Sequence, residues 1–280
     1  MTKEYSWTVM GGRVLGPAPF LIAGIVNVTP DSFYDGGKNF DSRTAVAHGR
    51  LLAEQGAHIL DIGGESTRPF ADSVSEAEEL ARVIPVIREL ATDYVVSVDT
   101  VKAEVARQSI EAGAAIVNDV SAFSLDPQLL EVVADLKPGY VLMHSQGKPE
   151  DMQIAPRYDN VVEDILTFFK KSLEKLVKAG LPENRIVLDP GIGFGKTMEH
   201  NLEILRNIDQ VAELGFPVYM ALSNKSVWGS LLGLGPDCRQ NATQAATAVL
   251  AARGIPIHRV HEVELTSQTL KIVKEIGGAN

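Results

Sequence analysis

Residues 94–119 have the sequence YVVSVDTVKAEVARQSIEAGAAIVND. A short run rich in valine, Tyr94–Val98, is followed by residues of helical period over Val101–Ala112 and by a second apolar run, Ala115–Val117. Apolar runs too short for a helix are typical of parallel strands buried on both faces. Gly113 can end the helix, because glycine adopts the left-handed conformation common there. The stretch therefore predicts a strand, a helix and a second strand parallel to the first.

The same alternation of short apolar runs and longer amphipathic segments continues along the chain. The runs are Leu21–Val26, His58–Ile62, Tyr94–Val98, Ala115–Val117, Tyr140–Met143, Ile186–Leu188, Pro217–Leu222 and Ile257–Val260. Helices are expected over Asp41–Gln55, after the cap Ser75, over Val101–Ala112, from Asp126, and over Tyr158–Ala179, Met198–Leu214, Asn241–Ala252 and Glu264–Ile276. Eight strands alternating with helices predict an α/β fold with parallel pairing and right-handed crossovers. We expect a closed (β/α)₈ TIM barrel, with a doubly wound open sheet as the alternative.

The first twenty residues fall outside this alternation. Residues Ser6–Val14, around Gly11 and Gly12, predict a small hairpin that closes the floor of the barrel. The chain contains no linker or low-complexity tract. We therefore expect residues 1–280 to form one domain, with residues 1–20 as its N-terminal hairpin.

The composition is that of an ordinary globular protein: 280 residues, of which 45% are hydrophobic and 22% charged. A formal net charge of −10 disfavours nucleic acid as a partner, because phosphate backbones bind basic surfaces. The single cysteine, Cys238, excludes an internal disulfide. The N-terminus has no apolar segment of a signal peptide, and no apolar run reaches the roughly 18 residues of a membrane span. We expect a cytoplasmic enzyme that does not bind membranes.

Polar residues follow the predicted strands. They are Asn27, Asp61, Asp99, Asn118, Asp119, His144, Asp189, Ser223, Asn224, Lys225 and His261. In a barrel the carboxyl ends of the strands meet at one mouth, which is where active sites of this fold lie. One such residue could be a turn or helix cap, but their convergence predicts a binding site.

The loop after the sixth strand, Asp189–Thr197, ends in Gly-Lys-Thr as a Walker A loop does. That motif also requires a glycine five positions before Gly195, where this chain has Pro190. A P-loop is therefore excluded.

Three of the strand-end residues could bind a flat polar heterocycle. Carboxylates such as Asp99 and Asp189 accept hydrogen bonds from an amidine-like edge, and Asn118 offers both a donor and an acceptor. These residue types suit a pterin or a guanine-like ring. Each aspartate, considered alone, could instead be the N-cap of the following helix rather than a ligand of a ring.

Basic residues gather on the seventh and eighth strands, where phosphate sites recur in this fold. An anion site is predicted there, in an otherwise acidic chain, from Lys225, Arg259 and His261. The alternative is that these three side chains are solvated charges on the surface. Asn27 could contribute to this site by binding a magnesium ion. An amide oxygen, diphosphate oxygens and water molecules form an ordinary coordination shell for Mg²⁺.

Taken together, these motifs resemble those of the dihydropteroate synthase family. The matching segments, in order, are Asn27–Gly37, Gly63–Pro69, Ser97–Thr100, Asn118–Ser121, Met143–His144, Asp189–Thr197, Lys225 and Arg259–His261. The resemblance implies a homodimeric transferase of folate biosynthesis that uses Mg²⁺. Such an enzyme condenses 6-hydroxymethyl-7,8-dihydropterin diphosphate with 4-aminobenzoate, giving 7,8-dihydropteroate and diphosphate. The aminobenzoate pocket of this family is the sulfonamide target.

The resemblance also implies roles for single residues. The catalytic residues would be Asp99 and Asp189, which stabilise charge on the pterin ring, and Lys225, which lies beside the ring. The substrate-binding residues would be Thr67, Arg68, Asp99, Asn118, Met143, Asp189, Phe194, Lys225, Ser226, Arg259 and His261, with Pro69 in the aminobenzoate pocket. Asn27 would bind the metal and Arg259 and His261 the diphosphate.

One position departs from the family pattern. The family usually has Ser-Arg-Lys after the seventh strand, and Asn224 here replaces the arginine. Asparagine cannot supply a guanidinium charge. Two alternatives stay open: a pterin-dependent methyltransferase that uses methyltetrahydrofolate, and a non-catalytic pterin-binding homologue. The methyltransferase has no use for the predicted diphosphate site.

Overall fold

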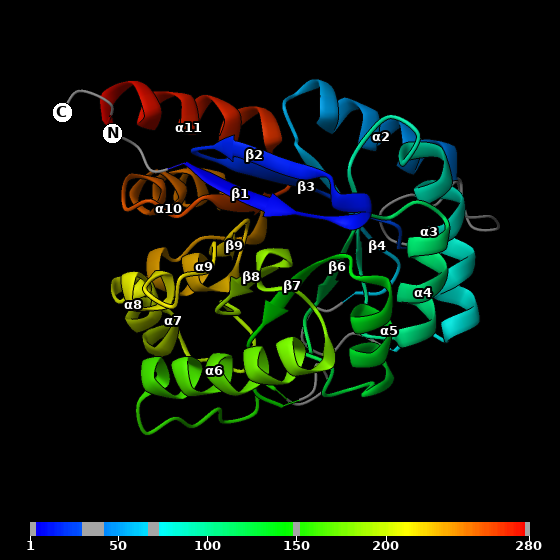
Figure 1. The fold of residues 1–280 in the computed structure, drawn as a ribbon. Helices are drawn as coiled ribbons and strands as arrows, with labels where there is room; N and C mark the ends of the chain where they lie inside the picture. The colour runs from blue at the N-terminus through cyan, green and yellow to red at the C-terminus, as the bar shows by residue number, and fades with distance from the viewer. Residues whose placement is uncertain (1–3, 30–41, 67–72, 148–151, 278–280) are drawn as a thin grey trace.

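The computed structural model describes residues 4–29, 42–66, 73–147 and 152–277. Within these residues, parallel strands form the wall of a barrel and helices surround it (Figure 1). The strands are β3 (Leu21–Asn27), β4 (Ile59–Gly63), β5 (Val96–Asp99), β6 (Ile116–Asp119), β7 (Gly139–Met143), β8 (Ile186–Asp189), β9 (Tyr219–Ala221) and β10 (Ile257–Val260). Their order is β8-β7-β6-β5-β4-β3-β10-β9, and a parallel bridge between Leu188 and Val218 joins the two ends. The predicted (β/α)₈ barrel is confirmed.

The helices lie in the expected intervals between the strands. They are α2 (Ser42–Glu54), α3 (Glu76–Leu90), α4 (Ala103–Glu111), α5 (Gln128–Leu136), α6 (Val161–Ala179), α7 (Met198–Arg206), α8 (Ile208–Ala212), α9 (Ser226–Leu232), α10 (Gln240–Ala252) and α11 (Val263–Gly277). The predicted cap of α3 is confirmed, because the Ser75 hydroxyl accepts a hydrogen bond from the backbone N–H of Glu78. None of the described helices is long and apolar enough to cross a membrane.

The single helix expected over Met198–Leu214 is wrong, because the chain leaves helical geometry at Asn207. The Arg253 guanidinium donates to the carbonyls of Leu205 and Arg206, at 2.6 and 2.9 Å. The last carbonyls of a helix have no donor within the helix, and here the Arg253 side chain supplies their hydrogen bonds. The helix can therefore end at this point. The short helix α9 was not expected either, since seven residues that include Gly229 show little periodicity.

The N-terminal hairpin consists of β1 (Tyr5–Thr8) and β2 (Val14–Ala18), which are antiparallel and joined through a 3₁₀ turn. It lies across the end of the barrel that faces the viewer in Figure 1. Trp7, Val9 and Leu15 are buried in one apolar cluster with residues of the barrel strands. The predicted hairpin is therefore confirmed as the floor of the barrel.

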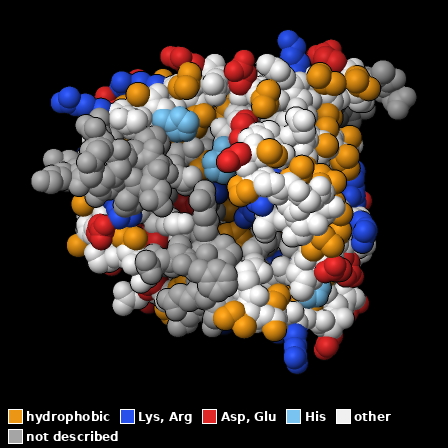
Figure 2. Space-filling model, turned by 180° about the vertical axis from the view of Figure 1, so that it is seen from behind, with side chains coloured by type: hydrophobic (Ala, Val, Ile, Leu, Met, Phe, Trp, Pro, Cys, Tyr) orange, Lys and Arg blue, Asp and Glu red, His pale blue; other side chains and the backbone are white. Residues whose placement is uncertain are grey.

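Apolar packing leaves only one end of the barrel interior polar. A large core fills the space between strands and helices, and the cluster under the hairpin fills the lower interior. Buried polar residues occupy the carboxyl ends of the strands, where Asp99 and Asn118 are register partners on β5 and β6. Figure 2 shows the molecule from the side opposite the hairpin, where acidic, basic and histidine side chains are visible around a hollow.

Candidate functional site

Arg259 organises the polar layer at the carboxyl end of the barrel. Its Nε donates to Asp61 Oδ2 and its Nη2 to Asp99 Oδ2, both at 2.6 Å. Asn118 donates from Nδ2 to the same Asp61 oxygen at 3.1 Å. Four strands, β4, β5, β6 and β10, thus contribute to one buried network. This network fixes the orientation of the side chains predicted to bind the ring.

The same layer contains two buried carboxylate oxygens that no described residue satisfies. Among the described residues, Asp61 Oδ1 and Asp99 Oδ1 are buried and accept no hydrogen bond. Burial raises the pKa of Asp99 to about 7, although the neighbouring Arg259 charge lowers it. Burial opposes the charged form of Arg259, but Asp61 and Asp99 outweigh it and raise the pKa of Arg259. Buried acceptors without partners are costly in a folded protein, so they mark a place where a ligand can donate.

Asp189, Lys225 and Phe194 form the adjoining wall of the site. Asp189 Oδ1 accepts from the backbone N–H of Gly191 at 2.7 Å, and burial raises the pKa of Asp189. The Lys225 ammonium lies 4.3 Å from the centroid of the Phe194 ring, a cation–π contact. Burial lowers the pKa of Lys225 to about 8, while the Asp189 charge raises it. The wall therefore combines an acceptor, a cation and an aromatic face.

The lysine of the Gly-Lys-Thr segment points into the protein. Lys196 Nζ donates to three backbone carbonyls, those of His144 at 3.2 Å and of Gly191 and Phe194 at 2.9 Å. These bonds use all three of its donors and tie the loop after β8 to the loop after β7. Burial lowers the pKa of Lys196 to about 7. Its contacts are those of a loop anchor, which agrees with the exclusion of a P-loop.

Gly191 and Gly195 let the same two loops approach closely. Both have positive φ, +68° and +62°, and a Cβ at either position would collide with a backbone carbonyl, that of His144 or Gln146. Only glycine fits both the conformation and the space. The shape of the wall around Phe194 therefore depends on these glycines.

At the mouth, β9 and β10 bring Ser223, Asn224, His261 and Glu262 together. Ser223 Oγ lies 2.8 Å from His261 Nδ1 and donates to Glu262 Oε2 at 3.2 Å. Asn224 has a left-handed backbone, with φ of +55°, and donates from Nδ2 to Glu262 Oε1 at 3.0 Å. Asparagine tolerates this conformation better than most residues do. The departure from the family pattern thus has a structural use.

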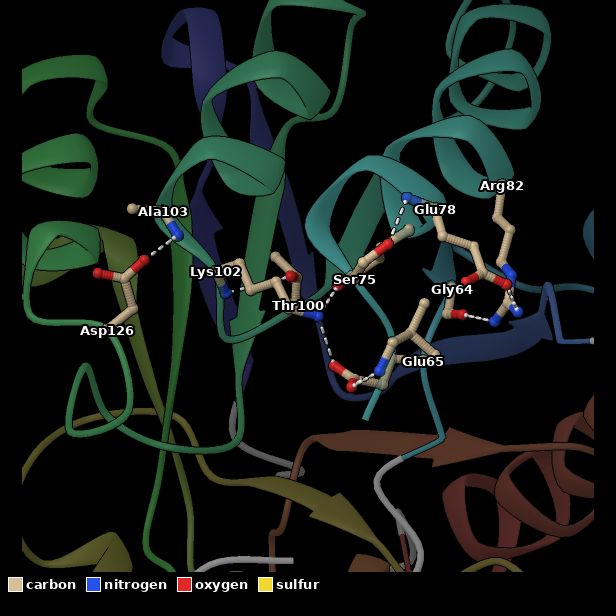
Figure 3. A network of polar contacts seen from close by, with 11 residues as sticks. Gly64, Glu65, Ser75, Glu78, Arg82, Thr100, Lys102, Ala103 and Asp126 are labelled. Atoms are coloured by element: carbon tan, nitrogen blue, oxygen red, sulfur yellow. Dashed lines mark hydrogen bonds and ion pairs between the residues drawn. The ribbon is translucent and has the colours of Figure 1, made fainter. Parts of the chain in front are cut away.

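A second polar network supports the segment after β4 (Figure 3). Lys102 Nζ bonds Glu65 Oε2 at 2.8 Å and the buried Glu79 at 2.5 Å. Glu65 Oε1 accepts from the backbone N–H of Val74 at 2.7 Å, and Arg82 donates to the carbonyl of Gly64. Thr67, Arg68 and Pro69 lie outside the described residues.

The remaining predicted residues are also at the mouth end. Asn27 ends β3 and is half-buried. Met143 ends β7 and packs with Phe194 in a small buried cluster. Ser226 is the first residue of α9, directly after Lys225. The described residues contain no group of three or more His, Cys, Asp or Glu side chains that could hold a metal ion.

The basic residues expected to form an anion site have different immediate partners, although Lys225 and Arg259 are close enough for each charge to affect the same carboxylate, Asp189. Lys225 faces Phe194 and Arg259 lies between carboxylates, whereas His261 contacts Ser223. Asp119, one of the strand-end residues, is structural: it accepts from Ser121, Phe123 and Tyr140. His144 is buried against Phe168, and burial lowers its pKa to about 2.

Sequence reasoning missed the supporting roles of four residues. Asp61 was noted only as a strand end, although an aspartate inside the run His58–Ile62 was a signal. The contacts from Lys196 to His144 and from Ser223 to Glu262 join segments distant in sequence, so local pattern could not identify them.

Comparisons with known proteins agree with this geometry. A family model described as "Pterin binding enzyme" matches residues 23–261. The chain is 42% identical to dihydropteroate synthase of Escherichia coli (strain K12) over 255 residues, 90% of each chain. It is 41% identical to that of Haemophilus influenzae over 253 residues, 90% of this chain and 92% of the other.

Solved structures are similar over nearly their full length. A dihydropteroate synthase of Yersinia pestis in complex with a sulfonamide drug gives a TM-score of 0.92 at 40% identity, covering 98% of this chain and 100% of the other. A dihydropteroate synthase of Xanthomonas albilineans with 4-aminobenzoic acid gives 0.90 at 42% identity, with the same coverage.

Proposed function

This chain belongs to the pterin-binding enzyme family, and we propose that it condenses 6-hydroxymethyl-7,8-dihydropterin diphosphate with 4-aminobenzoate. The products are 7,8-dihydropteroate and diphosphate, so the enzyme is a transferase with dihydropteroate synthase activity. The observation that carries the proposal is the buried layer of Asp61, Asp99, Asn118 and Arg259, with an unpartnered oxygen on each aspartate among the described residues. A flat ring with several N–H donors satisfies those oxygens.

The ring binds among the buried polar side chains. Asp99 and Asp189 accept from its nitrogen edge, and Asn118 donates or accepts beside them. Lys225, held over Phe194, lies next to the ring. Met143 supplies apolar contact from β7. As positive charge develops on the ring, the two carboxylates stabilise it without attacking it.

The leaving group departs toward β10. The bond between the methylene carbon and the diphosphate oxygen breaks, and the diphosphate keeps the electron pair. Arg259 contributes positive charge there while Asp61 and Asp99 hold its Nε and Nη2, and His261 binds the anion from the mouth. Mg²⁺, bound by Asn27 and the diphosphate oxygens, would neutralise further charge on the leaving group. An amide oxygen suits this hard cation, so the residue present fits it.

The aromatic amine then adds to the methylene carbon and loses a proton, which completes the new C–N bond. Phe194 and Ser226 border the aminobenzoate subsite, and Pro69 belongs to it on the family pattern. Thr67 and Arg68 are substrate-binding residues on the same pattern. A dihydropteroate synthase with 4-aminobenzoic acid and one with a sulfonamide are among the similar structures, which supports the same two ligands here. Sulfonamides would therefore compete with 4-aminobenzoate for this subsite.

The assembly and location follow the family. The enzyme works as a homodimer in the cytoplasm, on small-molecule substrates and without nucleic acid or membrane partners. The acidic net charge of −10 supports the proposed lack of a nucleic-acid partner, and the single cysteine supports a reducing compartment.

A coupled assay of diphosphate release tests the reaction. Purified protein is supplied with the pterin diphosphate and Mg²⁺, with and without 4-aminobenzoate. Release that depends on the amine, with dihydropteroate as the product, supports the proposal. No release despite calorimetric binding of the pterin would overturn it, and a methyltetrahydrofolate binding test would then separate a methyltransferase from a non-catalytic homologue.

A further inference from the structure

Ser223 contacts His261 at Nδ1, the ring nitrogen other than Nε2, and Glu262 contacts Ser223. Ser223 Oγ is 2.8 Å from His261 Nδ1 and 3.2 Å from Glu262 Oε2. The backbone N–H of His261 also donates to this oxygen, at 3.2 Å. Ser223 is 7% exposed, so water has little access to compete for its hydroxyl. These three contacts decide which way the hydroxyl hydrogen points.

A serine hydroxyl has one hydrogen to donate and two lone pairs to accept with. If it donated to His261 Nδ1, an oxygen lone pair would face the Glu262 carboxylate. If it donates to Glu262, the bond is charge-assisted, and the two lone pairs receive the backbone N–H and Nδ1–H of His261. The second arrangement gives a hydrogen bond to the Ser223 hydroxyl and to all three of the groups around it. It requires the proton of His261 to be on Nδ1.

Asn224 holds Glu262 in place for this arrangement. Its Nδ2 donates to Glu262 Oε1 at 3.0 Å, on the oxygen that Ser223 does not use. The Asn224 backbone is itself fixed by Thr243 and Arg239 near the start of α10. The carboxylate therefore has a defined position, with one oxygen directed at Ser223.

We infer that Ser223 and Glu262 are positioning residues for His261, which fix its proton on Nδ1 and place a negative charge behind the ring. A histidine held in this way donates from Nε2 only as an imidazolium, and the Glu262 charge compensates that cation. The inference deepens the proposed function and rests on it in one respect, the binding of diphosphate by His261. It gives the unusual Asn224 a purpose, since the asparagine orients the carboxylate.

Nitrogen-15 NMR of histidine-labelled protein tests the proton position directly. In the neutral state of His261, the wild type should show a protonated Nδ1 and an unprotonated Nε2. Ser223→Ala should move the proton toward Nε2, and Ser223→Thr, which keeps a hydroxyl, should retain the wild-type pattern. A wild-type proton on Nε2, or an unchanged pattern in Ser223→Ala, would overturn the inference. This readout needs no turnover, so it is separate from the test of the reaction.

Inhibition by inorganic diphosphate tests the charge. Partners behind a metal-binding histidine typically contribute tenfold or more to its function, and a comparable contribution here means that Glu262→Gln should weaken diphosphate inhibition by about tenfold. The matched control is Glu264→Gln, which removes the same charge from an exposed position on α11. Equal effects of the two variants would overturn the role of Glu262. A thermal melt of each variant confirms that it is folded.

Discussion

At the scale of single residues, the buried Lys225 predicts a pH limit on catalysis. Burial lowers its pKa to about 8, so the ammonium is present below that pH and is lost above it. Because the ammonium donates stronger, charge-assisted hydrogen bonds to acceptor atoms of the ring than a neutral amine does, kcat/KM should fall on the alkaline side with a midpoint near pH 8. A pH–rate profile measures this. Lys225→Arg, whose guanidinium stays charged, should move the limb to higher pH. A wild-type limb centred near pH 10 would contradict the assignment.

Asn224 gives a second prediction at this scale. Asn224→Arg places a residue less tolerant of φ +55° there and replaces the amide that donates to Glu262, which should cost about 1 kcal/mol of stability. Since Asn224 precedes Lys225 and Ser226, KM for 4-aminobenzoate should change more than KM for the pterin diphosphate. Asn224→Gly is the matched control, because it keeps the backbone conformation and loses only the amide. Equal shifts in the two KM values would show that the position does not influence the aminobenzoate subsite.

The chemistry of single residues was accessible from the sequence, but their partners were not. Asp99, Asn118 and Asp189 were identifiable because strand ends of a barrel converge. The bond from Arg259 to Asp61 spans 198 positions in sequence and depends on barrel closure. The same holds for Ser223 and Glu262. The sequence pattern therefore indicates which residues lie in the buried layer. The fold is needed to show which carboxylates pair with Arg259.

At the scale of elements, Lys196 predicts a role for the loop that follows β8. Lys196→Met removes three donors from buried backbone carbonyls, which should cost about 2 kcal/mol of stability. Because one of those carbonyls is that of Phe194, KM for 4-aminobenzoate should also rise. Urea denaturation and steady-state kinetics measure both effects.

The control for this loop variant is Lys170→Met on the exposed face of α6, which should change neither quantity. If Lys196→Met were as stable and active as Lys170→Met, the loop would not depend on its anchor.

Elements with a clear period were predictable and short or interrupted ones were not. Each predicted strand has a counterpart, because runs of Val, Ile and Leu bounded by Gly or Pro are distinctive. At the break at Asn207, Arg253 donates to the preceding carbonyls from the end of another helix, a contact that has no local signal in the sequence. Helix α9 is too short to show an amphipathic pattern.

At the scale of the whole molecule, the barrel separates stability from catalysis. Trp7 is buried in the floor, and its Nε1 donates to the carbonyl of Arg185, far from the polar mouth. Trp7→Ala should destabilise the protein by about 3–5 kcal/mol, while the folded fraction keeps its kcat/KM. Denaturant titration and assays well below the melting temperature measure the two quantities. A large loss of activity in fully folded Trp7→Ala would contradict the separation.

The overall architecture follows from the sequence because one requirement, burial of parallel strands on both faces, recurs along the chain. Closure at the bridge between Leu188 and Val218 is a property of the assembled sheet and has no local signal. Asp189 lies one residue after that closure, in the wall that adjoins the buried layer, and it bears the central claim: the ring binds among these buried acidic side chains.

Calorimetric binding of 6-hydroxymethylpterin, without its diphosphate, to wild type and to Asp189→Asn is the most direct test. The backbone N–H of Gly191 would donate to the amide oxygen of the new asparagine, as it now donates to Asp189 Oδ1. The NH₂ group of that asparagine would then face the donor edge of the ring. A lost charge-assisted hydrogen bond corresponds to about 1.5–3 kcal/mol, so the ring should bind at least about tenfold more weakly, with affinity for inorganic diphosphate unchanged. Unchanged affinity for the ring in Asp189→Asn would contradict the account.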